Sequence, residues 1–287
     1  MPSIVIIGGG PAGLSAAIYA ARANLQTTVL YQNGGALEKT DKIENYFGFV
    51  DPISGPDLLA QGHLLAARLG ATLLQAEVTG IEYAEHGFTV KTAAGAYPAD
   101  ALILATGAPR AVPKIEGVTA FEGRGVSYCA ICDAFFYRGK AVAVLGQGEY
   151  ALEEARTLLP VAGSVTLLTN GKPAPEQLPT GLAVDTRPIT AITGADKVAQ
   201  VTFAAGEPLP VDGVFIAYGT AGSSDFARKL GAQIDGTRIQ ADGKQQTNVP
   251  GLFAAGDCTG GLLQVVKAVA DGAQAGLSAV NFVRHQA

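Results

Sequence analysis

The stretch SIVIIGGGPAG, residues 3–13, decides the fold of this chain. Its first part, 3–7, is a short β-branched apolar run, and the glycines after it lead into an alanine-rich, helix-compatible segment at 14–23. A second apolar run follows at 27–31. A strand, a glycine turn, a helix and a strand within about 30 residues are typical of a βαβ unit with a parallel sheet.

The three glycines of this turn have the G-x-G-x-x-G spacing of a dinucleotide-binding fold. Gly8 permits the tight turn, Gly10 lets the backbone approach a pyrophosphate, and Gly13 allows the helix to pack closely on the strand. The helix N-terminus then offers unpaired N–H groups and the positive end of its dipole to the phosphates. The next strand ends YQN (31–33), without an acidic residue for a ribose hydroxyl.

A second unit of this kind follows further along the chain. A buried-type strand at 141–145 leads into the turn GQGEYA (146–151), a helix at 152–159 and another strand at 165–168. Two such units predict two dinucleotide-type domains.

The second turn is the weaker nucleotide site. Glu149 crowds it, and the Glu149 carboxylate would repel a phosphate. The strand that follows ends TNGK (169–172), which offers neither an acid for a ribose hydroxyl nor an arginine pair for a 2′-phosphate. The residues therefore leave two interpretations open: this domain binds a nicotinamide nucleotide, or it is purely structural.

Composition indicates where the two domains meet. GAPRAVP (107–113) breaks regular structure after a strand at 101–106, and a polar stretch at 235–248 precedes the C-terminal segment. We expect an α/β protein of two Rossmann-like dinucleotide-binding domains, of the three-layer ββα sandwich type, with the second inserted in the first. The expected ranges are 1–111 with 238–287 for the first domain, and 112–237 for the inserted one.

The C-terminal segment holds a strand at 252–255, the turn Gly256-Asp257 and a long helix. The Asp257 carboxylate would lie at the carboxyl end of a parallel sheet, where it suits a sugar-like hydroxyl or caps the next helix. The helix N-terminus near Leu263-Gln264 would stabilise negative charge on a bound ring. One helical face would carry Leu262, Val266, Val269, Ala273, Leu277 and Val280.

The composition excludes several classes of protein. Of 287 residues, 48% are hydrophobic and 16% are charged, which excludes a disordered chain. The formal net charge is −5, and no basic stripe indicates nucleic-acid binding. The longest apolar runs are far below the ~18 residues of a membrane span, and the N-terminus shows no basic segment or cleavage site. We therefore expect a cytoplasmic protein with no membrane or nucleic-acid partner.

The cysteines mark the candidate redox centre. Cys129 and Cys132 form a C-x-x-C pair directly before Asp133, and Cys258 stands apart. Two intervening residues let both sulfurs meet in one turn as a reducible disulfide, and Asp133 is placed to exchange a proton with a thiol. The alternative is half of a zinc site, but the remaining cysteine and the histidines are not paired at ligand spacing. We expect no metal.

With these motifs, the chain resembles the low-molecular-weight thioredoxin reductases over nearly its whole length. The resemblance implies an FAD domain interrupted by the domain that carries the cysteines, a homodimer, and a thioredoxin-like protein disulfide as substrate. The matching stretches are GGGPAGLSAAIYAARANL (8–25), IENYFG (43–48), ATGAPR (105–110), GRGVSYCAICDAFFYRGKAVAVLGQG (123–148) and TNVPGLFAAGDCTGG (247–261).

The resemblance also implies roles for individual residues. Cys132 matches the cysteine that exchanges electrons with the flavin, Cys129 the one that forms the mixed disulfide with the substrate, and Asp133 the acid that handles the proton. Together with the motifs above, it predicts FAD contacts at Gly8, Gly10, Pro11, Ala12, Gly13, Gly35, Asn45, Thr106, Gly107, Gly256, Asp257, Leu263 and Gln264.

Three stretches depart from the family pattern. TNG (169–171) stands where NADPH-dependent members have a His-Arg-Arg-type cluster, LQV (263–265) replaces Arg-Gln-Ala, and GGAL (34–37) replaces Gly-Gly-Gln-Leu. The first change removes the physical basis for NADPH recognition and is similar to the branch that takes electrons from ferredoxin or another flavin. A ferredoxin, usually acidic, would need a basic patch such as one formed by Arg110, Lys114, Arg124, Arg138 and Lys140.

Three functional hypotheses follow. The leading one is an FAD-dependent dithiol–disulfide oxidoreductase that reduces a thioredoxin-like partner, with ferredoxin or another flavin as donor. The second is an NADPH-dependent thioredoxin reductase with an atypical 2′-phosphate site at Lys172 or Arg187. The third is a non-catalytic flavoprotein or a metal-binding regulatory module.

Overall fold

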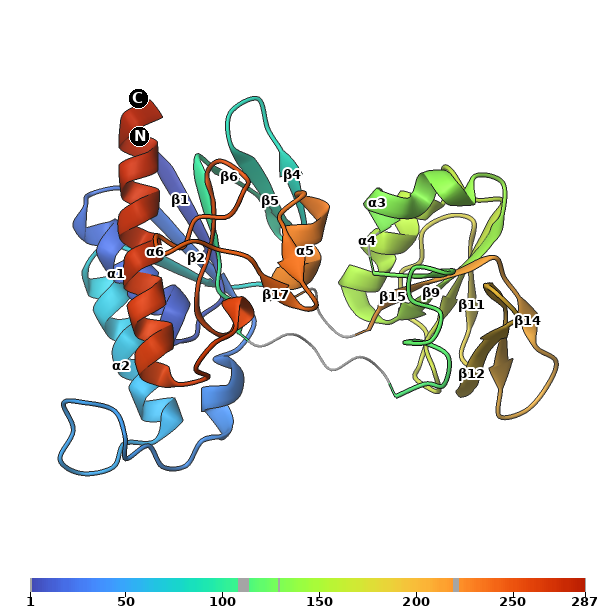
Figure 1. The fold of residues 1–287 in the computed structure, drawn as a ribbon, viewed down its shortest axis with the longest axis horizontal. Coiled ribbons are helices and arrows are strands. Elements are labelled where there is room, and N and C mark those ends of the chain that lie inside the picture. Colours follow the sequence, from blue (N-terminus) through green and yellow to red (C-terminus); the bar gives the residue numbers. More distant parts are fainter. Residues whose placement is uncertain (1, 108–113, 129, 219–221, 287) are drawn as a thin grey trace. The chain divides into compact units, whose positions relative to one another are not determined.

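The computed structural model describes residues 2–107, 114–128, 130–218 and 222–286. The chain is an α/β protein with two compact units, each built on its own parallel sheet (Figure 1). Within the described ranges, no helix has both the length and the apolar character needed to cross a membrane.

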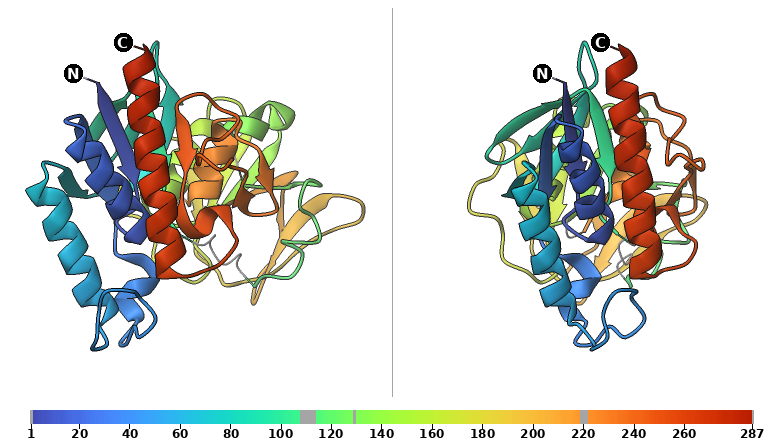
Figure 2. Two further views of the ribbon diagram at one scale, coloured as in Figure 1. Left: turned by 60° about the vertical axis from the view of Figure 1, so that its left-hand side comes forward. Right: turned by 90° about the vertical axis from the view of Figure 1, so that its left-hand side faces the viewer.

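Unit 1 has three layers, as the ββα prediction requires. Its central five-stranded parallel sheet has the order β18-β7-β1-β2-β3. Three helices lie side by side on one face, and a three-stranded antiparallel meander lies on the other (Figure 2). The sheet strands are β1 (Ser3–Ile7), β2 (Gln26–Tyr31), β3 (Thr72–Gln75), β7 (Ala101–Leu104) and β18 (Leu252–Ala254). The helices are α1 (Pro11–Arg22), α2 (Gly55–Arg68) and α6 (Val265–Gln286), and the meander is β4 (Val78–Tyr83), β5 (Phe88–Thr92) and β6 (Gly95–Ala99).

The close approach of α1 and α6 depends on glycine. A Cβ on Gly272 would lie 2.0 Å from the Ala12 carbonyl oxygen, and one on Gly276 would lie 2.6 Å from that of Ala16. The face of α6 that packs on the core is therefore made of small residues, since a larger side chain would push the helices apart. The apolar stripe expected from the sequence differs from this face: Val266 is 50% exposed and Leu277 is 45% exposed.

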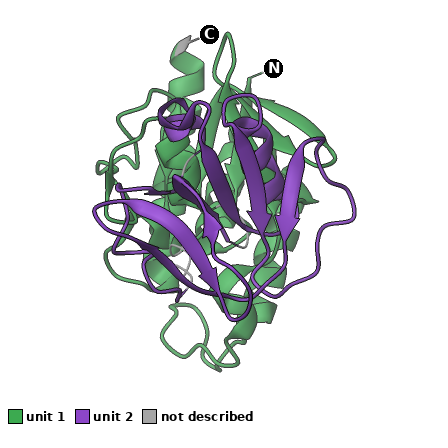
Figure 3. Cartoon of the chain, turned by 90° about the vertical axis from the view of Figure 1, so that its right-hand side faces the viewer, with its two compact units in different colours: residues 1–109, 222–287 green, residues 110–221 purple. Residues whose placement is uncertain are grey.

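The chain leaves the inserted unit at an earlier point than expected. The compact units comprise residues 1–109 with 222–287, and 110–221 (Figure 3). Residues 222–237, expected in the inserted domain, lie with unit 1, because α5 (Ser223–Lys229) packs on β4 and the buried Phe226 joins that unit. The first junction falls within 108–113, outside the described residues. The remaining elements of unit 1 are the 3₁₀ turns η1 (Gly35–Lys39) and η3 (Gly256–Thr259), and the short strands β16 (Ile234–Asp235) and β17 (Arg238–Ile239).

Unit 2 repeats the architecture on a smaller scale. Its parallel sheet has the order β11-β10-β9-β15-β8, and a second, antiparallel sheet has the order β12-β13-β14. The first sheet contains β8 (Val126–Ser127), β9 (Ala141–Gly146), β10 (Ser164–Leu168), β11 (Leu182–Asp185) and β15 (Gly213–Ala217). The second contains β12 (Ile189–Gly194), β13 (Val198–Phe203) and β14 (Leu209–Pro210). The helical elements are α3 (Ala130–Asp133), η2 (Ala134–Tyr137) and α4 (Gly148–Leu158).

Candidate functional site

The glycine turn of unit 1 has two kinds of glycine. A Cβ on Gly8, whose φ is +125°, would lie 2.1 Å from the Ala105 carbonyl oxygen, and one on Gly13 would lie 1.9 Å from that of Gly8. The protein itself therefore requires these two glycines. Gly10 is different, because its φ is −81° and a Cβ there would meet only the Gly34 oxygen, at 4.0 Å. The space beside Gly10 is open for a ligand.

Helix α1 begins at this turn without a cap of its own. Gly10 is the N-cap residue, and no side chain in the described structure accepts a hydrogen bond from the first N–H groups of the helix. The first turn, which begins with Pro11 and Ala12, has no acidic residue. Unpaired N–H groups and the positive end of the helix dipole therefore remain available to an anion. Together with the open space beside Gly10, this turn fits the pyrophosphate of a dinucleotide.

Lys267 organises the loop at the end of β18. Its Nζ donates hydrogen bonds to Gly256 O at 3.0 Å, Thr259 Oγ1 at 2.9 Å and Gly260 O at 2.6 Å. It also forms an ion pair of 2.7 Å with Asp271, which accepts hydrogen bonds from the N–H of Gly256 at 3.1 Å and from Gln245 Nε2 at 3.3 Å. One ammonium group and one carboxylate on α6 thus hold η3 at both of its ends.

Asp257 lies within this loop with its carboxylate free for a ligand. Burial raises the pKa of Asp257; Lys267 opposes the rise and Asp271 adds to it. No described donor hydrogen-bonds its side chain, so Asp257 does not cap α6. This favours the first of the two roles that the sequence left open, an acceptor for a sugar-like hydroxyl at the carboxyl end of the sheet.

The segment after β7 is fixed by a serine from α5. The Thr106 N–H donates to Ser223 Oγ at 3.1 Å, and the Ser223 N–H donates to Thr106 Oγ1 at 2.7 Å. Gly107 follows with a φ of +82° and open space beside it. Cys258, behind this segment, is fully buried, and burial raises its pKa to about 11. Its thiol is therefore a packing group with little thiolate at neutral pH.

Two expected cofactor contacts meet although they lie far apart in the sequence. Asn45 Nδ2 donates to Gln264 Oε1 at 2.8 Å. Leu263, next to Gln264, is 57% exposed, and Gly35 has a φ of +69° with open space where a Cβ would point. The described residues of the predicted FAD set thus all belong to unit 1 and include the turn, η3 and this pair.

The glycine turn of unit 2 differs in its chemistry. A Cβ on Gly146 would lie 2.1 Å from the Ala217 carbonyl oxygen, so the tight turn is kept. However, Glu149 lies in the first turn of α4, where it pairs with Arg156 at 3.4 Å. The first turn of this helix therefore carries a negative charge, which would repel a phosphate.

The residues after β10 are engaged in packing. Asn170 Oδ1 accepts the N–H of Ile189 at 2.8 Å. Arg187 donates to both carboxylate oxygens of Asp185, which lowers the pKa of Asp185, and its guanidinium lies 3.8 Å from the centre of the Phe203 ring. The arginine that could have bound a 2′-phosphate is committed to an ion pair and an aromatic ring.

The redox segment lies in α3 and the turn before it. Cys132 is disulfide-bonded, and Cys129 lies outside the described residues. Asp133 Oδ2 accepts a hydrogen bond from Ser127 Oγ at 2.7 Å. Burial, and then the charges of Asp133 and Asp212, raise the pKa of Tyr137. Asp133 is thus held at the end of the helix turn that carries Cys132.

Exposed apolar side chains surround this segment. Ile131 is 58% exposed, Phe135 is 71% exposed and Phe136 is 66% exposed. The Arg138 guanidinium lies over the Phe135 ring, 5.5 Å from its centre. Large apolar side chains gathered beside a reactive disulfide are typical of a protein–protein contact surface.

Several residues of these sites were not found from the sequence. His63 is partly buried against the turn: its Nε2 lies 3.3 Å from Gly9 O and its ring packs on Tyr31. Lys267 and Ser223 carry no motif and act through long-range contacts. In the described part of the chain, no group of three or more His, Cys, Asp or Glu side chains could hold a metal ion.

Comparison with known proteins finds one family over almost the whole chain. Residues 2–272 match the family model described as pyridine nucleotide-disulphide oxidoreductase. The thioredoxin reductase of Listeria monocytogenes is 35% identical over 299 aligned residues, which cover 98% of this chain and 93% of the relative.

Two solved structures have similar folds. The atypical thioredoxin reductase of Desulfovibrio vulgaris Hildenborough is 41% identical, with a TM-score of 0.93, and the match covers 100% of this chain and 99% of the other. The ferredoxin-flavin thioredoxin reductase of Clostridium acetobutylicum is 33% identical, with a TM-score of 0.72, and the match covers 99% and 98% of the two chains.

Proposed function

The chain belongs to the pyridine nucleotide-disulphide oxidoreductases, in their low-molecular-weight thioredoxin reductase class, and from this premise we propose that it reduces a thioredoxin-like protein with electrons from a donor other than NADPH. It is a flavin-dependent oxidoreductase, and its cofactor is FAD.

We place the cofactor in unit 1. The α1 N-terminus and Gly10 would bind the pyrophosphate, Asp257 would accept from a ribityl-type hydroxyl, and Asn45 with Gln264 would lie near the ring. Bound FAD supplies two-electron exchange between a donor and a disulfide. The chain's own contribution is a turn and a loop that are already shaped around these contacts.

The disulfide that includes Cys132 is the proposed working group. In its reduced form, a thiolate of the pair attacks the partner's disulfide and forms a mixed disulfide. The second thiol then resolves it, so that the chain regains its disulfide and the partner leaves as a dithiol. Asp133, held by Ser127, would take up and return the proton. The apolar surface of Ile131, Phe135 and Phe136 would receive the thioredoxin-like partner.

Replacement of Cys132 by Ser tests this cycle against the non-catalytic alternative. The variant should bind FAD with unchanged affinity and lose measurable reduction of thioredoxin, whereas Cys258→Ser should keep it. Activity retained by C132S, or zinc found at one equivalent in the purified protein, would support the regulatory or metal-binding hypothesis instead.

The choice of donor rests on one observation: the second glycine turn lacks the features that bind NADPH. Glu149 lies in the first turn of α4, and no arginine cluster follows β10. Arg187, which the NADPH hypothesis would use, is bound to Asp185 and Phe203. We therefore propose ferredoxin or another flavin as the donor. The alternative remains an NADPH-dependent enzyme that recruits Lys172.

An anaerobic titration separates the two donors. The oxidised holoprotein is mixed with NADPH, NADH, or a chemically reduced ferredoxin, and the flavin absorbance near its visible maximum is followed. We expect bleaching with reduced ferredoxin or a reduced flavin, and none within seconds with either nucleotide. Prompt bleaching by NADPH would overturn the proposed donor and leave the thioredoxin reductase activity standing.

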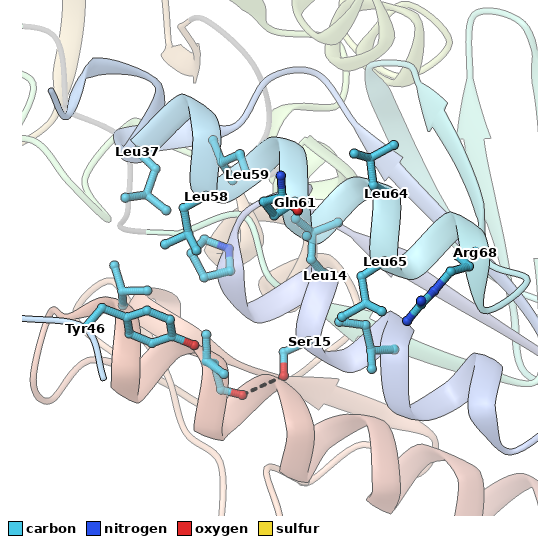
Figure 4. A pocket seen from close by; sticks show the side chains of 15 residues that line it. Leu14, Ser15, Leu37, Tyr46, Leu58, Leu59, Gln61, Leu64, Leu65 and Arg68 are labelled. Carbon is cyan, nitrogen blue, oxygen red and sulfur yellow. Dashed lines mark hydrogen bonds between the residues drawn. The ribbon is translucent and has the colours of Figure 1, made fainter. Parts of the chain in front are cut away.

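A homodimer is the second part of the proposal. A cavity of about 470 Å³ opens between α1, α2 and α6 of unit 1, and apolar side chains such as Leu14, Leu58 and Leu65 line it (Figure 4). Leu64, at its edge, is 66% exposed. We propose that a second copy of the chain covers this surface, in the cytoplasm. Light scattering should give twice the 29.2 kDa chain mass, and Leu64→Glu should lower it.

A further inference from the structure

Glu154 is a buried carboxylate that the proposed cycle does not use. It lies on α4 and is 2% exposed. Its neighbour Glu153 is 31% exposed and pairs with Arg156 at 3.1 Å. A buried carboxylate is costly unless it is hydrogen-bonded, and such groups gather at functional sites. Two adjacent glutamates on one helix thus have very different environments.

The carboxylate of Glu154 is directed to the redox segment. Its Oε2 accepts the N–H of Ala130 at 2.8 Å, and both groups are buried. Ala130 is the first residue of α3, the single helical turn that contains Cys132. Helix α3 packs on α4 within unit 2 (Figure 1). Because a helix rises about 1.5 Å per residue, a negative charge at the Ala130 N–H lies within one helical turn of residue Cys132 along α3.

Two physical effects follow from this placement. The hydrogen bond fixes the start of α3 and hence the position of Cys132, because it ties the redox turn to the longer helix α4. The negative charge also occupies the N-terminal end of the turn, where it disfavours a thiolate close by. The reduced pair gains less from ionisation when a carboxylate is present, and it is then the stronger reductant.

We propose that Glu154 is a positioning residue that holds the redox turn and keeps the Cys132 pair strongly reducing. The proposal rests on the proposed function, because it needs a pair that cycles. On reduction, the S–S bond breaks as two electrons from the proposed donor and two protons enter, and the charge of Glu154 disfavours ionisation of the two thiols that result. Asp133, which belongs to α3 itself, is at the opposite end of the turn and is held by Ser127.

The test is the thiol–disulfide equilibrium of the holoprotein. Wild type, Glu154→Gln and the matched control Glu153→Gln are equilibrated with reduced and oxidised dithiothreitol, so that each protein disulfide reduced is matched by one dithiothreitol oxidised. Alkylation and mass spectrometry of the peptide containing Cys132 then give the reduced fraction. E154Q keeps an acceptor for the Ala130 N–H and removes the charge.

We expect E154Q to shift the equilibrium toward the dithiol by about tenfold, the scale of one charge-assisted interaction, and E153Q by less than about twofold. Glu154→Asp keeps the charge but withdraws it from Ala130, so a smaller shift in the same direction is expected. E154D also keeps the test open if E154Q does not accumulate as folded protein.

The outcomes separate this inference from the function beneath it. A wild-type pair that dithiothreitol never reduces would overturn the proposed function. A wild-type pair that cycles, with folded E154Q or E154D at the wild-type equilibrium, would overturn the role of Glu154 alone. An E153Q shift equal to that of E154Q would likewise overturn the role of Glu154. The shift of the equilibrium would then follow from the net charge of the protein and not from the position of Glu154.

Discussion

The two glycine turns of this chain both lead from a strand into a helix, but the helices that follow them differ in the charge of their first turns. In unit 1, α1 begins uncapped at Gly10, and its first turn has no acid. In unit 2, α4 begins at Gly148 with Glu149 in its first turn. Both turns keep a glycine that no larger residue could replace: Gly8 in one and Gly146 in the other. The tight geometry of the turn is therefore preserved in both units, and a helix N-terminus without an acidic residue is found in only one.

Glycine has two uses in a nucleotide-binding fold: it lets backbone segments pack closely, and it leaves room for a ligand. Gly8 and Gly146 serve the packing of strand against strand, which both units need. The packing of unit 1 does not require glycine at position 10, because a Cβ there would have ample room. A glycine that the packing of the protein does not require is therefore better evidence of a bound ligand than a glycine that the packing requires.

The largest expected effect comes from Gly10→Val. The φ of −81° accepts a side chain, so the unfolding free energy of the apoprotein should change by less than about 1 kcal/mol. The new methyl groups would fill the space of the pyrophosphate, and FAD affinity should fall by about 100-fold. Flavin fluorescence titration and urea unfolding of the apoprotein measure the two quantities.

Gly148→Ala is the matched change in unit 2. Gly148 has a φ of +77°, so alanine should cost about 1 kcal/mol of stability and leave FAD affinity unchanged. If G148A weakened FAD binding as much as G10V does, the contrast between the two turns would be lost.

Lys267→Met should have the next largest effect. The variant loses three hydrogen bonds and an ion pair that hold η3, and we expect FAD affinity to fall about tenfold. The exposed Lys244, replaced by Met in the same way, is the control. Equal affinity in both variants would show that η3 keeps its shape without the ammonium group.

A pH dependence should follow from Asp257. Because burial raises its pKa in the folded protein, the carboxylate takes up a proton at a higher pH than an ordinary aspartate of pKa about 3.9. FAD affinity should be complete above the raised pKa and fall as the pH drops through it, since a protonated Asp257 is a poorer acceptor for a hydroxyl. Asp257→Asn should remove this dependence, and the exposed Asp51→Asn should preserve it.

The smallest effect is expected for Glu149→Gln. Loss of the charge from the first turn of α4 should lower stability by about 0.5 kcal/mol, measured by urea unfolding. NADPH should still fail to bleach the flavin, because the residues after β10 offer no arginine cluster. Nucleotide bleaching gained by E149Q alone would identify the carboxylate as the whole barrier.

The sequence predicted what is encoded locally. The turn at 8–13 carries its constraints within a few residues, so the strand and the helix could both be derived from it, and the α/β class with two units is confirmed. The pyrophosphate site at this turn stays a prediction. Asn45 and Gln264 were both expected near the cofactor through family likeness, and the structure joins them by a hydrogen bond across 219 positions of sequence.

The boundary of the inserted unit, the packing face of α6 and the burial of Glu154 depend on long-range contacts, which the periodicity of the sequence does not predict. Ser223 pairs with Thr106 across 117 positions, which is why the segment from 222 lies with unit 1 although its composition suggested otherwise. The stripe on α6 was misleading because glycine and alanine, with weak hydrophobic signals, make the closest contact. Glu154 looks like a surface residue in sequence, and its burial comes from the packing of α3 on α4.

The contact of Gly272 with the Ala12 carbonyl has a consequence for biogenesis. Ala12 precedes the inserted unit in the sequence, whereas Gly272 belongs to a helix that is made after the whole of it. Unit 2 can therefore finish folding while its host is still half built. Because α6 packs along α1, the helical layer of unit 1 is complete only after α6 has been made.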